Sequence, residues 1–330
     1  MKTMIKQSAI TLSIMAAFGM ASTAVAQSNV EGTLKIKTEI GKGGIVNLAT
    51  GKESTAEAAI NTVEKSTLKG DVTMDLKVGK SGLVNLATGE KSEARMDVNA
   101  IKNSTVQNAA IKTDVSKGGI VNLATGKESK ANLGLGAIRD TNMTGGNVEL
   151  DTKIGKGGVV NLATGQKSTA SLLITSLQGA SGSGNIKSST DISEGAVVNL
   201  ATGQESTADL LISSVRDSEV NSDVTIKTTI GKGGVVNLAT GKNSVATAAI
   251  GSITDGSKVS SGTVDINTDI KGGVVNLATG QDSKANLLVS SIQGSEIAGD
   301  TQIDTQIEGA IVNLATAKNS TSNLSVGSVK

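Results

Sequence analysis

Apolar and polar residues alternate along much of this chain, and the alternating stretches recur at nearly constant intervals. In one such stretch, small and apolar residues occupy every second position, as at Ser168, Ala170, Leu172, Ile174 and Ser176. Period-two alternation is typical of a β-strand with one buried face. The pattern therefore predicts an all-β chain.

A second alternating stretch precedes a glycine-rich turn. Val224, Ile226, Thr228 and Ile230 alternate with polar residues and are followed by Lys-Gly-Gly at 232–234. Glycine suits such a turn because it adopts positive φ without steric cost. Between the two stretches lies a short phrase, Val-Asn-Leu-Ala-Thr-Gly, which we interpret as a short middle strand. We therefore predict three short strands in each interval.

The middle phrase occurs eight times, and its even spacing makes the interval a structural unit. Successive asparagines are separated by 38, 37, 39, 38, 38, 39 and 37 residues. Such a period is typical of a stacked array, so we predict a parallel β-solenoid, resembling a β-helix, of eight repeats of about 38 residues. The asparagines are Asn47, Asn85, Asn122, Asn161, Asn199, Asn237, Asn276 and Asn313. The glycines that end the phrase are Gly51, Gly89, Gly126, Gly165, Gly203, Gly241 and Gly280, and the last repeat has Ala317 instead.

Charged residues after the phrase indicate how the repeats stack. Lys52 and Glu53 in the first repeat correspond to Glu90 and Lys91 in the second, so both charges change sign. Opposite charges favour each other on adjacent strands about 4.8 Å apart, and much less at twice that separation. This alternation favours one coil of the solenoid per repeat.

The repeated asparagines have a structural interpretation that we prefer to a ligand site. An amide side chain carries donors and acceptors, so identical asparagines on successive strands can hydrogen-bond to each other as a ladder. The repeated glycines correspondingly serve as turn residues.

The first 26 residues predict a secretory signal peptide. Lys2 and Lys6 precede an apolar stretch, and Ala24-Val25-Ala26 offers a cleavage site. A membrane anchor is less consistent, because the apolar stretch is shorter than the roughly 20 residues that span a bilayer. Residues 27–330 then form a single repeat domain, and we expect a secreted, extracellular or cell-surface location.

The composition of the predicted mature chain excludes several classes of function. It has 29 basic and 30 acidic residues, so nucleic acid is not an expected partner. The chain has no cysteine, histidine or proline, and its one aromatic residue lies within the signal peptide. Ser, Asp, Glu and Lys recur as periodic columns, whereas an active site needs a unique cluster. We predict no enzyme activity, no catalytic residues, no cofactor and no metal.

Six repeats contain Gly-x-x-Asn-x-Ala, as at Gly44–Ala49 and Gly234–Ala239. This motif resembles the centre of the repeat in curlins, the secreted bacterial amyloid subunits, and more loosely the repeats of the pseudomonad biofilm amyloid. The resemblance implies a functional amyloid: a cross-β solenoid that polymerises into extracellular fibres and is nucleated at a surface partner. Curlin repeats place glutamine on both sides of this centre, where this chain has Lys42 and Glu53.

We therefore expect an exported structural protein that self-associates into extracellular fibres, biofilm matrix or a surface coat. The first repeat is expected to begin near Gly32 and the last to run to Lys330, which leaves little room for separate caps on the open strand edges. The expected partners are further copies joined end to end, with a surface nucleator or secretion partner. The alternative is a monomeric solenoid, either a cell-adhesion protein or an ice- or surface-binding protein, for which the threonine column of the phrase could form a flat array.

Overall fold

The protein is described here from a computed structural model, which covers residues 4–5, 10–16, 24–26, 29–80 and 82–330. All regular elements in these residues are β-strands, and every strand pair is parallel. The predicted all-β parallel solenoid of about eight turns is thus confirmed. No helix in the described part of the chain is long and apolar enough to cross a membrane.

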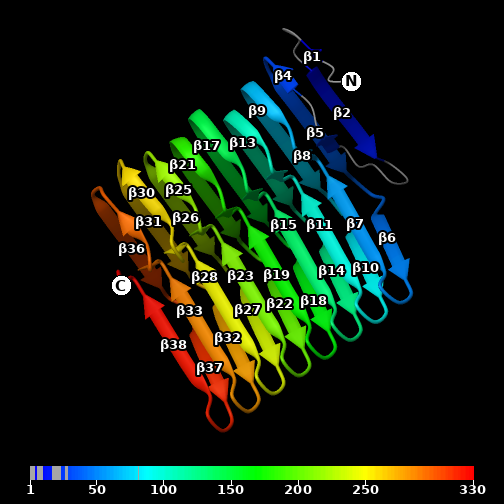
Figure 1. Cartoon of the computed structure of the whole chain (residues 1–330), viewed down its shortest axis with the longest axis vertical. Helices are drawn as coiled ribbons and strands as arrows, with labels where there is room; N and C mark the ends of the chain where they lie inside the picture. Colours follow the sequence, from blue (N-terminus) through cyan, green and yellow to red (C-terminus); the bar gives the residue numbers. More distant parts are fainter. Residues whose placement is uncertain (1–3, 6–9, 17–23, 27–28, 81) are drawn as a thin grey trace.

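Each repeat makes one coil, and the coils stack in sequence order, so that colour runs smoothly along the stack in Figure 1. The middle strands of the first two repeats are direct neighbours, with Asn47 opposite Asn85. One coil per repeat, the arrangement favoured by the charge alternation, is therefore what the structure has. The described coils pass through four sheets, except that the last coil adds to the fourth only an isolated bridge at Val329. We number the sheets 1 to 4 in the order in which the chain meets them from the long alternating strand onward.

Sheet 1 holds the long alternating strands. Its strands are β1 (Met4–Ile5), β2 (Ile10–Ala16), β4 (Asn29–Glu31), β5 (Leu34–Ile40), β9 (Thr67–Val78), β13 (Thr105–Val115), β17 (Asn142–Ile154), β21 (Ser181–Ile192), β25 (Glu219–Asn221), β26 (Val224–Ile230), β30 (Lys258–Ser261), β31 (Val264–Ile270), β35 (Glu296–Ile297) and β36 (Thr301–Ile307). In β26 the four residues of the predicted apolar face are buried.

Sheet 2 holds the repeated phrase, and sheet 3 holds the strand that follows it. Sheet 2 consists of β6 (Ile45–Thr50), β10 (Leu83–Thr88), β14 (Ile120–Thr125), β18 (Val159–Thr164), β22 (Ala196–Thr202), β27 (Gly234–Thr240), β32 (Gly273–Thr279) and β37 (Ile311–Thr316). Sheet 3 consists of β7 (Thr55–Ile60), β11 (Glu93–Val98), β15 (Lys130–Leu135), β19 (Thr169–Ile174), β23 (Thr207–Ile212), β28 (Val245–Ile250), β33 (Lys284–Val289) and β38 (Thr321–Val326).

Sheet 4 corrects the prediction of three strands per repeat. Its strands are β3 (Ala24–Ala26), β8 (Thr62–Glu64), β12 (Ile101–Lys102), β16 (Ile138–Arg139), β20 (Leu177–Gln178), β24 (Val215–Arg216), β29 (Ile253–Thr254) and β34 (Ile292–Gln293). These two- and three-residue strands are too short to show alternation. They lie where a single apolar residue, such as Val63 or Leu177, follows the bend after sheet 3, and both side chains are fully buried.

Sheets 2 and 3 form a narrow arch in each coil. Alanines from both sheets meet along its whole length, as Ala163 and Ala170 do in the fourth coil, and these alanines form one buried cluster. The buried Ser168 closes the turn by donating its Oγ to the carbonyl oxygen of Thr202 in the next coil, at 3.0 Å. Near this turn the space between the two sheets is therefore filled by alanine and serine.

The rest of the coil encloses a wider core. Leucine, isoleucine, valine and methionine fill it, among them Leu150 and Ile154 from sheet 1, Leu172 from sheet 3 and Leu177 from sheet 4. All four side chains have no exposed surface. This core holds most of the large apolar area that the fold buries, and the hydrophobic effect makes it the main source of stability.

The predicted signal peptide lies only partly within the described residues. Residues 1–3, 6–9 and 17–23 fall outside them. In the described part, β2 pairs with β5 and β3 pairs with β8. The predicted cleavage after Ala26 remains a prediction.

Candidate functional site

The eight predicted asparagines occupy one column that runs through the arch. In the six interior coils their side chains are fully buried. Each Nδ2 donates to the Oδ1 of the next asparagine, with separations of 2.8 to 2.9 Å from Asn47 through Asn313. Asn199 also lies 2.9 Å from the carbonyl oxygen of Asp209 and 3.1 Å from that of Ala170, both in sheet 3. The interior amides thus join coil to coil and sheet to sheet, and they are closed to any ligand.

The seven predicted turn glycines also form a column. Their φ angles lie between 116° and 133°, a region that favours glycine. A Cβ atom at Gly165 would lie 2.0 Å from the carbonyl oxygen of Gly126 in the preceding coil. Both φ and the close stacking therefore require glycine here. In the last coil Ala317 adopts φ 93°.

Charged side chains at the arch turn alternate between coils. Lys52 lies 3.9 Å from Glu90, and Lys91 lies 3.8 Å from Glu53. About half or more of most of these side chains is exposed, so each pair contributes at most a few tenths of a kcal/mol. Such pairs set the register of the stack more than its stability.

A second group of charges covers the corner between sheets 3 and 4. Arg216 is nearly buried, and its guanidinium lies 2.6 Å from Oδ2 of Asp209 and 3.1 Å from Oδ2 of Asp255. Burial lowers the pKa of Arg216, but the two aspartates outweigh burial and raise it. This cluster is a paired structural contact.

Lys102 is the candidate among these charges for nucleophilic chemistry, because it is partly buried. Its ammonium lies 2.8 Å from Oδ2 of Asp97, which Arg139 also contacts at 3.2 Å. Burial lowers the pKa of Lys102, but its hydrogen bond and charge interaction with Asp97 outweigh burial and raise it. An amine nucleophile needs the opposite shift.

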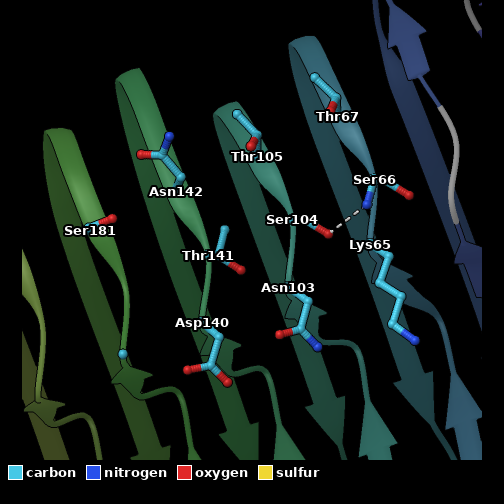
Figure 2. A pocket seen from close by; sticks show the side chains of 11 residues that line it. Lys65, Ser66, Thr67, Asn103, Ser104, Thr105, Asp140, Thr141, Asn142 and Ser181 are labelled. Carbon is cyan, nitrogen blue, oxygen red and sulfur yellow. Dashed lines mark hydrogen bonds between the residues drawn. The ribbon is translucent and has the colours of Figure 1, made fainter.

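A shallow polar hollow of about 440 Å³ follows the bend after sheet 4 (Figure 2). Lys65, Asn103 and Asp140 line the hollow from equivalent positions of successive coils, and each has a positive φ near 50°. The backbone N–H of Ser66 donates to Oγ of Ser104 at 3.2 Å. The hollow is therefore a row of repeated turn positions. Among the described residues no group of three acidic, histidine or cysteine side chains could hold a metal ion.

The outward face of sheet 2 carries the threonine column that the sequence analysis named, together with apolar columns that it did not assign to this face. Its side chains come from three columns that are identical in all eight coils: the valine before each asparagine, the leucine after it and the threonine two residues later. In the interior coils these residues are half-buried by their column neighbours, whereas Val46 in the first coil is 62% exposed. The sequence could have indicated this surface, because the same valine, leucine and threonine occur in all eight repeats although the core does not require them.

Comparison with known proteins finds no matching family model, no matching curated protein and no matching solved structure. The likeness of the Gly-x-x-Asn-x-Ala motif to curlin repeats therefore stays a resemblance in sequence.

Proposed function

We propose that this chain is an exported structural protein whose copies stack end to end into extracellular fibres, a biofilm matrix or a surface coat. One observation carries the proposal: the two edge strands of sheet 2, β6 and β37, have the same sequence, Ile-Val-Asn-Leu-Ala-Thr. If β37 of one copy docks against β6 of the next, the pairing repeats the register found between interior coils. Every interior coil is thus a template for the joint.

The asparagine ladder gives the joint a direction. Inside the solenoid each amide donates toward the following coil, so Asn47 donates to Asn85 and Asn276 donates to Asn313. At the two ends, Oδ1 of Asn47 and Nδ2 of Asn313 are complementary. Head-to-tail stacking would let Asn313 donate to Asn47 of the next copy and continue the ladder.

Ser322 is expected to slow the formation of this joint, because it competes for the hydrogen bond of Asn313. Sheet 3 has alanine at the equivalent position in the seven preceding coils. Nδ2 of Asn313 donates to Oγ of Ser322 at 2.9 Å, and this hydroxyl donates in turn to the carbonyl oxygen of Asn313 at 2.8 Å. Ser322 thus accepts the hydrogen bond that Nδ2 of Asn313 would otherwise donate to the asparagine of the next copy.

Predicted cleavage of the signal peptide would change the other end of the solenoid, at the first coil. Strands β1, β2 and β3 pair with β4, β5 and β8 of the first coil. Their removal would expose parallel strand edges, which readily recruit another chain. Export would then be coupled to assembly.

The test is fibre formation by residues 27–330, followed by electron microscopy and X-ray fibre diffraction. We expect fibres that seed their own growth and give a reflection near 4.8 Å along the fibre axis. Ser322→Ala should shorten the lag before growth, whereas Thr321→Ala, an exposed neighbouring change, should leave it unaltered. A β-rich monomer that forms no fibres over weeks, with or without Ser322, would contradict the proposal.

Deletion of the eighth repeat separates two versions of the joint. If this repeat mainly restrains assembly, its loss should accelerate fibre growth. If it is the docking end, its loss should abolish growth.

A second candidate function is binding of a monomeric solenoid to a flat surface, as an adhesin or an ice-binding protein. The observation that favours it is the outward, half-exposed threonine column of sheet 2, exemplified by Thr164 and Thr202. Thr164→Lys with Thr202→Lys should abolish adsorption or ice growth inhibition by a monomer. An end-to-end assembly would retain its fibres in this variant.

A further inference from the structure

The outward face of sheet 2 is apolar, uncharged and regular. Sixteen of its 24 outward side chains are the valines and leucines that flank the asparagines, and the other eight are threonines. The valines are Val46, Val84, Val121, Val160, Val198, Val236, Val275 and Val312, and the leucines are Leu48, Leu86, Leu123, Leu162, Leu200, Leu238, Leu277 and Leu314. The eight strands lie side by side in nearly the same direction (Figure 1).

The solenoid does not need this face to be apolar for its own folding. The inward residues of the same strands, Asn161 and Ala163 for example, fill the arch. The outward valines and leucines belong to none of the buried core clusters. A β-strand tolerates polar outward residues equally well, as the outward Lys187, Ser189 and Asp191 of sheet 1 show. An apolar face kept in all eight coils therefore indicates a contact outside the chain.

The chemistry of the face restricts its partner. It holds no charge with which to bind a nucleic acid, an acidic peptide or an anionic headgroup. Its apolar columns run along the solenoid with a strand spacing of about 4.8 Å and lie about 7 Å apart across the strands. A surface with the same flatness and the same column spacing is its natural complement, and a second copy of this chain presents one.

The size of the face is also sufficient. Six-residue strands are about 20 Å long and eight strands span about 38 Å, so each copy offers about 750 Å². Stable specific interfaces bury about 800 Å² on each partner. Two antiparallel or parallel copies can therefore bury a standard interface with this one surface, with the sheets about 10 Å apart and the columns of one seated between those of the other.

We propose that two copies of the chain pair laterally, face to face, through the valine and leucine columns of sheet 2. A two-fold axis makes the contact self-complementary, since the same patch serves both copies. This interface is perpendicular to the end-to-end joint and does not depend on it. A chain that cannot stack still dimerises, and a fibre built by stacking contains paired solenoids.

The first test is the mass of the purified full chain in solution, measured by light scattering after size exclusion. We expect a dimer of twice the 33.0 kDa chain mass. Leu162→Lys with Leu200→Lys places charges at the centre of the face and should yield monomers with unchanged β-sheet circular dichroism. The matched control, Ser189→Lys with Thr225→Lys, adds the same charges to outward positions of sheet 1 and should remain dimeric. A monomeric parent chain, or a dimer that survives the leucine substitutions, would overturn the proposal.

A second measurement does not depend on variants that add buried charge. Because the chain has no cysteine, Leu162→Cys with Leu200→Cys introduces the only thiols. A short thiol-reactive cross-linker should join two copies of this variant. The same substitutions at Ser189 and Thr225 should give no cross-linked dimer. Equal cross-linking of both pairs would indicate random collision and contradict the proposal.

Fibres, where they form, separate this inference from the proposed function. A single stack contains one chain per about 38 Å of length. Paired solenoids double the mass per length measured by electron microscopy, and the double leucine variant should halve it. Dimers without fibres would support the lateral pairing and contradict the end-to-end joint. Fibres with the mass per length of a single stack would support the end-to-end joint and contradict the lateral pairing.

Discussion

The arch of sheets 2 and 3 and the long strands of sheet 1 differ in how strictly their length repeats from coil to coil. In the arch of sheets 2 and 3, the spacing from the asparagine to the end of the second strand is the same in every repeat, as from Asn47 to Ile60 and from Asn161 to Ile174. In sheet 1 the register shifts between several neighbouring strands, for example near Thr144 and Asn147. Length differences among repeats are thus absorbed outside the arch.

The difference reflects the size and polarity of what each half encloses. The inward positions of the arch hold alanine, serine and asparagine. The asparagines must meet both the next coil and the facing strand. A shift of one residue would break all of these contacts at once. The wide core contains large aliphatic side chains, which can repack around a bulge at lower cost. Strict repetition is therefore a property of close packing between sheets.

The largest expected effect comes from inserting one residue into each half. An alanine inserted between Ser171 and Leu172 would turn Leu172 and Ile174 outward, because side chains alternate along a strand. We expect a loss of about 5 kcal/mol in the free energy of unfolding, measured by urea unfolding followed by circular dichroism. The same insertion between Thr144 and Gly145, at an existing register shift with open space around Gly145, should cost less than about 1 kcal/mol. Equal costs would remove the distinction between the halves.

A matched pair of glycine substitutions separates backbone strain from stacking. Gly51 and Gly165 have nearly the same φ, 125° and 124°, but a Cβ at Gly51 meets nothing within 4 Å. Gly51→Ala should therefore cost only the backbone strain, about 1–2 kcal/mol. Gly165→Ala should cost about 3 kcal/mol, since its Cβ also collides with the preceding coil. Equal melting curves for the two variants would show that the coils can move apart.

Next in size is the loss of one amide from the ladder. Asn199→Ala leaves Oδ1 of Asn237 without its donor inside the arch, whereas Nδ2 of Asn161 keeps its two backbone acceptors in sheet 3. A buried unsatisfied group costs about 1–3 kcal/mol, so we expect about 2 kcal/mol of destabilisation. Asn47→Ala, in the more exposed first coil, should cost less than half as much. A loss at Asn199 no larger than that at Asn47 would argue against the ladder as a stabilising element.

The smallest expected effect has the opposite sign. In sheet 1, Oγ1 of the buried Thr152 has no hydrogen-bond partner among the described residues, and the glycine at 136 faces it. Thr152→Val keeps the shape and removes the unsatisfied hydroxyl, so stability should rise by about 1 kcal/mol. Thr190, which accepts a hydrogen bond from Ser213 at 2.5 Å, provides the control: Thr190→Val should not stabilise. Destabilisation at Thr152 would show that the polar column of sheet 1 is as necessary as that of the arch.

The regular part of this fold could be predicted from the sequence because each coil repeats the same constraints. Alternation located the strands of sheets 1 and 3, and the charge alternation at Glu53 and Lys91 indicated one coil per repeat. Sheet 4 was missed because two residues cannot show a period. The valine and leucine columns of the outward face of sheet 2 were not predicted, because the phrase has apolar residues on both sides of the strand, as at Val159 and Val160. They lie outside because the alternate residues of the same strand, Val159, Asn161 and Ala163, face inward.

The measurement that tests the central claim most directly is amide hydrogen exchange of the folded chain, resolved to single strands. If the arch is the invariant and tightly closed unit, the interior strands of sheets 2 and 3, such as β18 and β19, should exchange most slowly. The short strands at the register shifts of sheet 1, β25 and β30, should exchange fastest among the interior coils. Protection that is uniform around the coil, or strongest in sheet 1, would contradict the account.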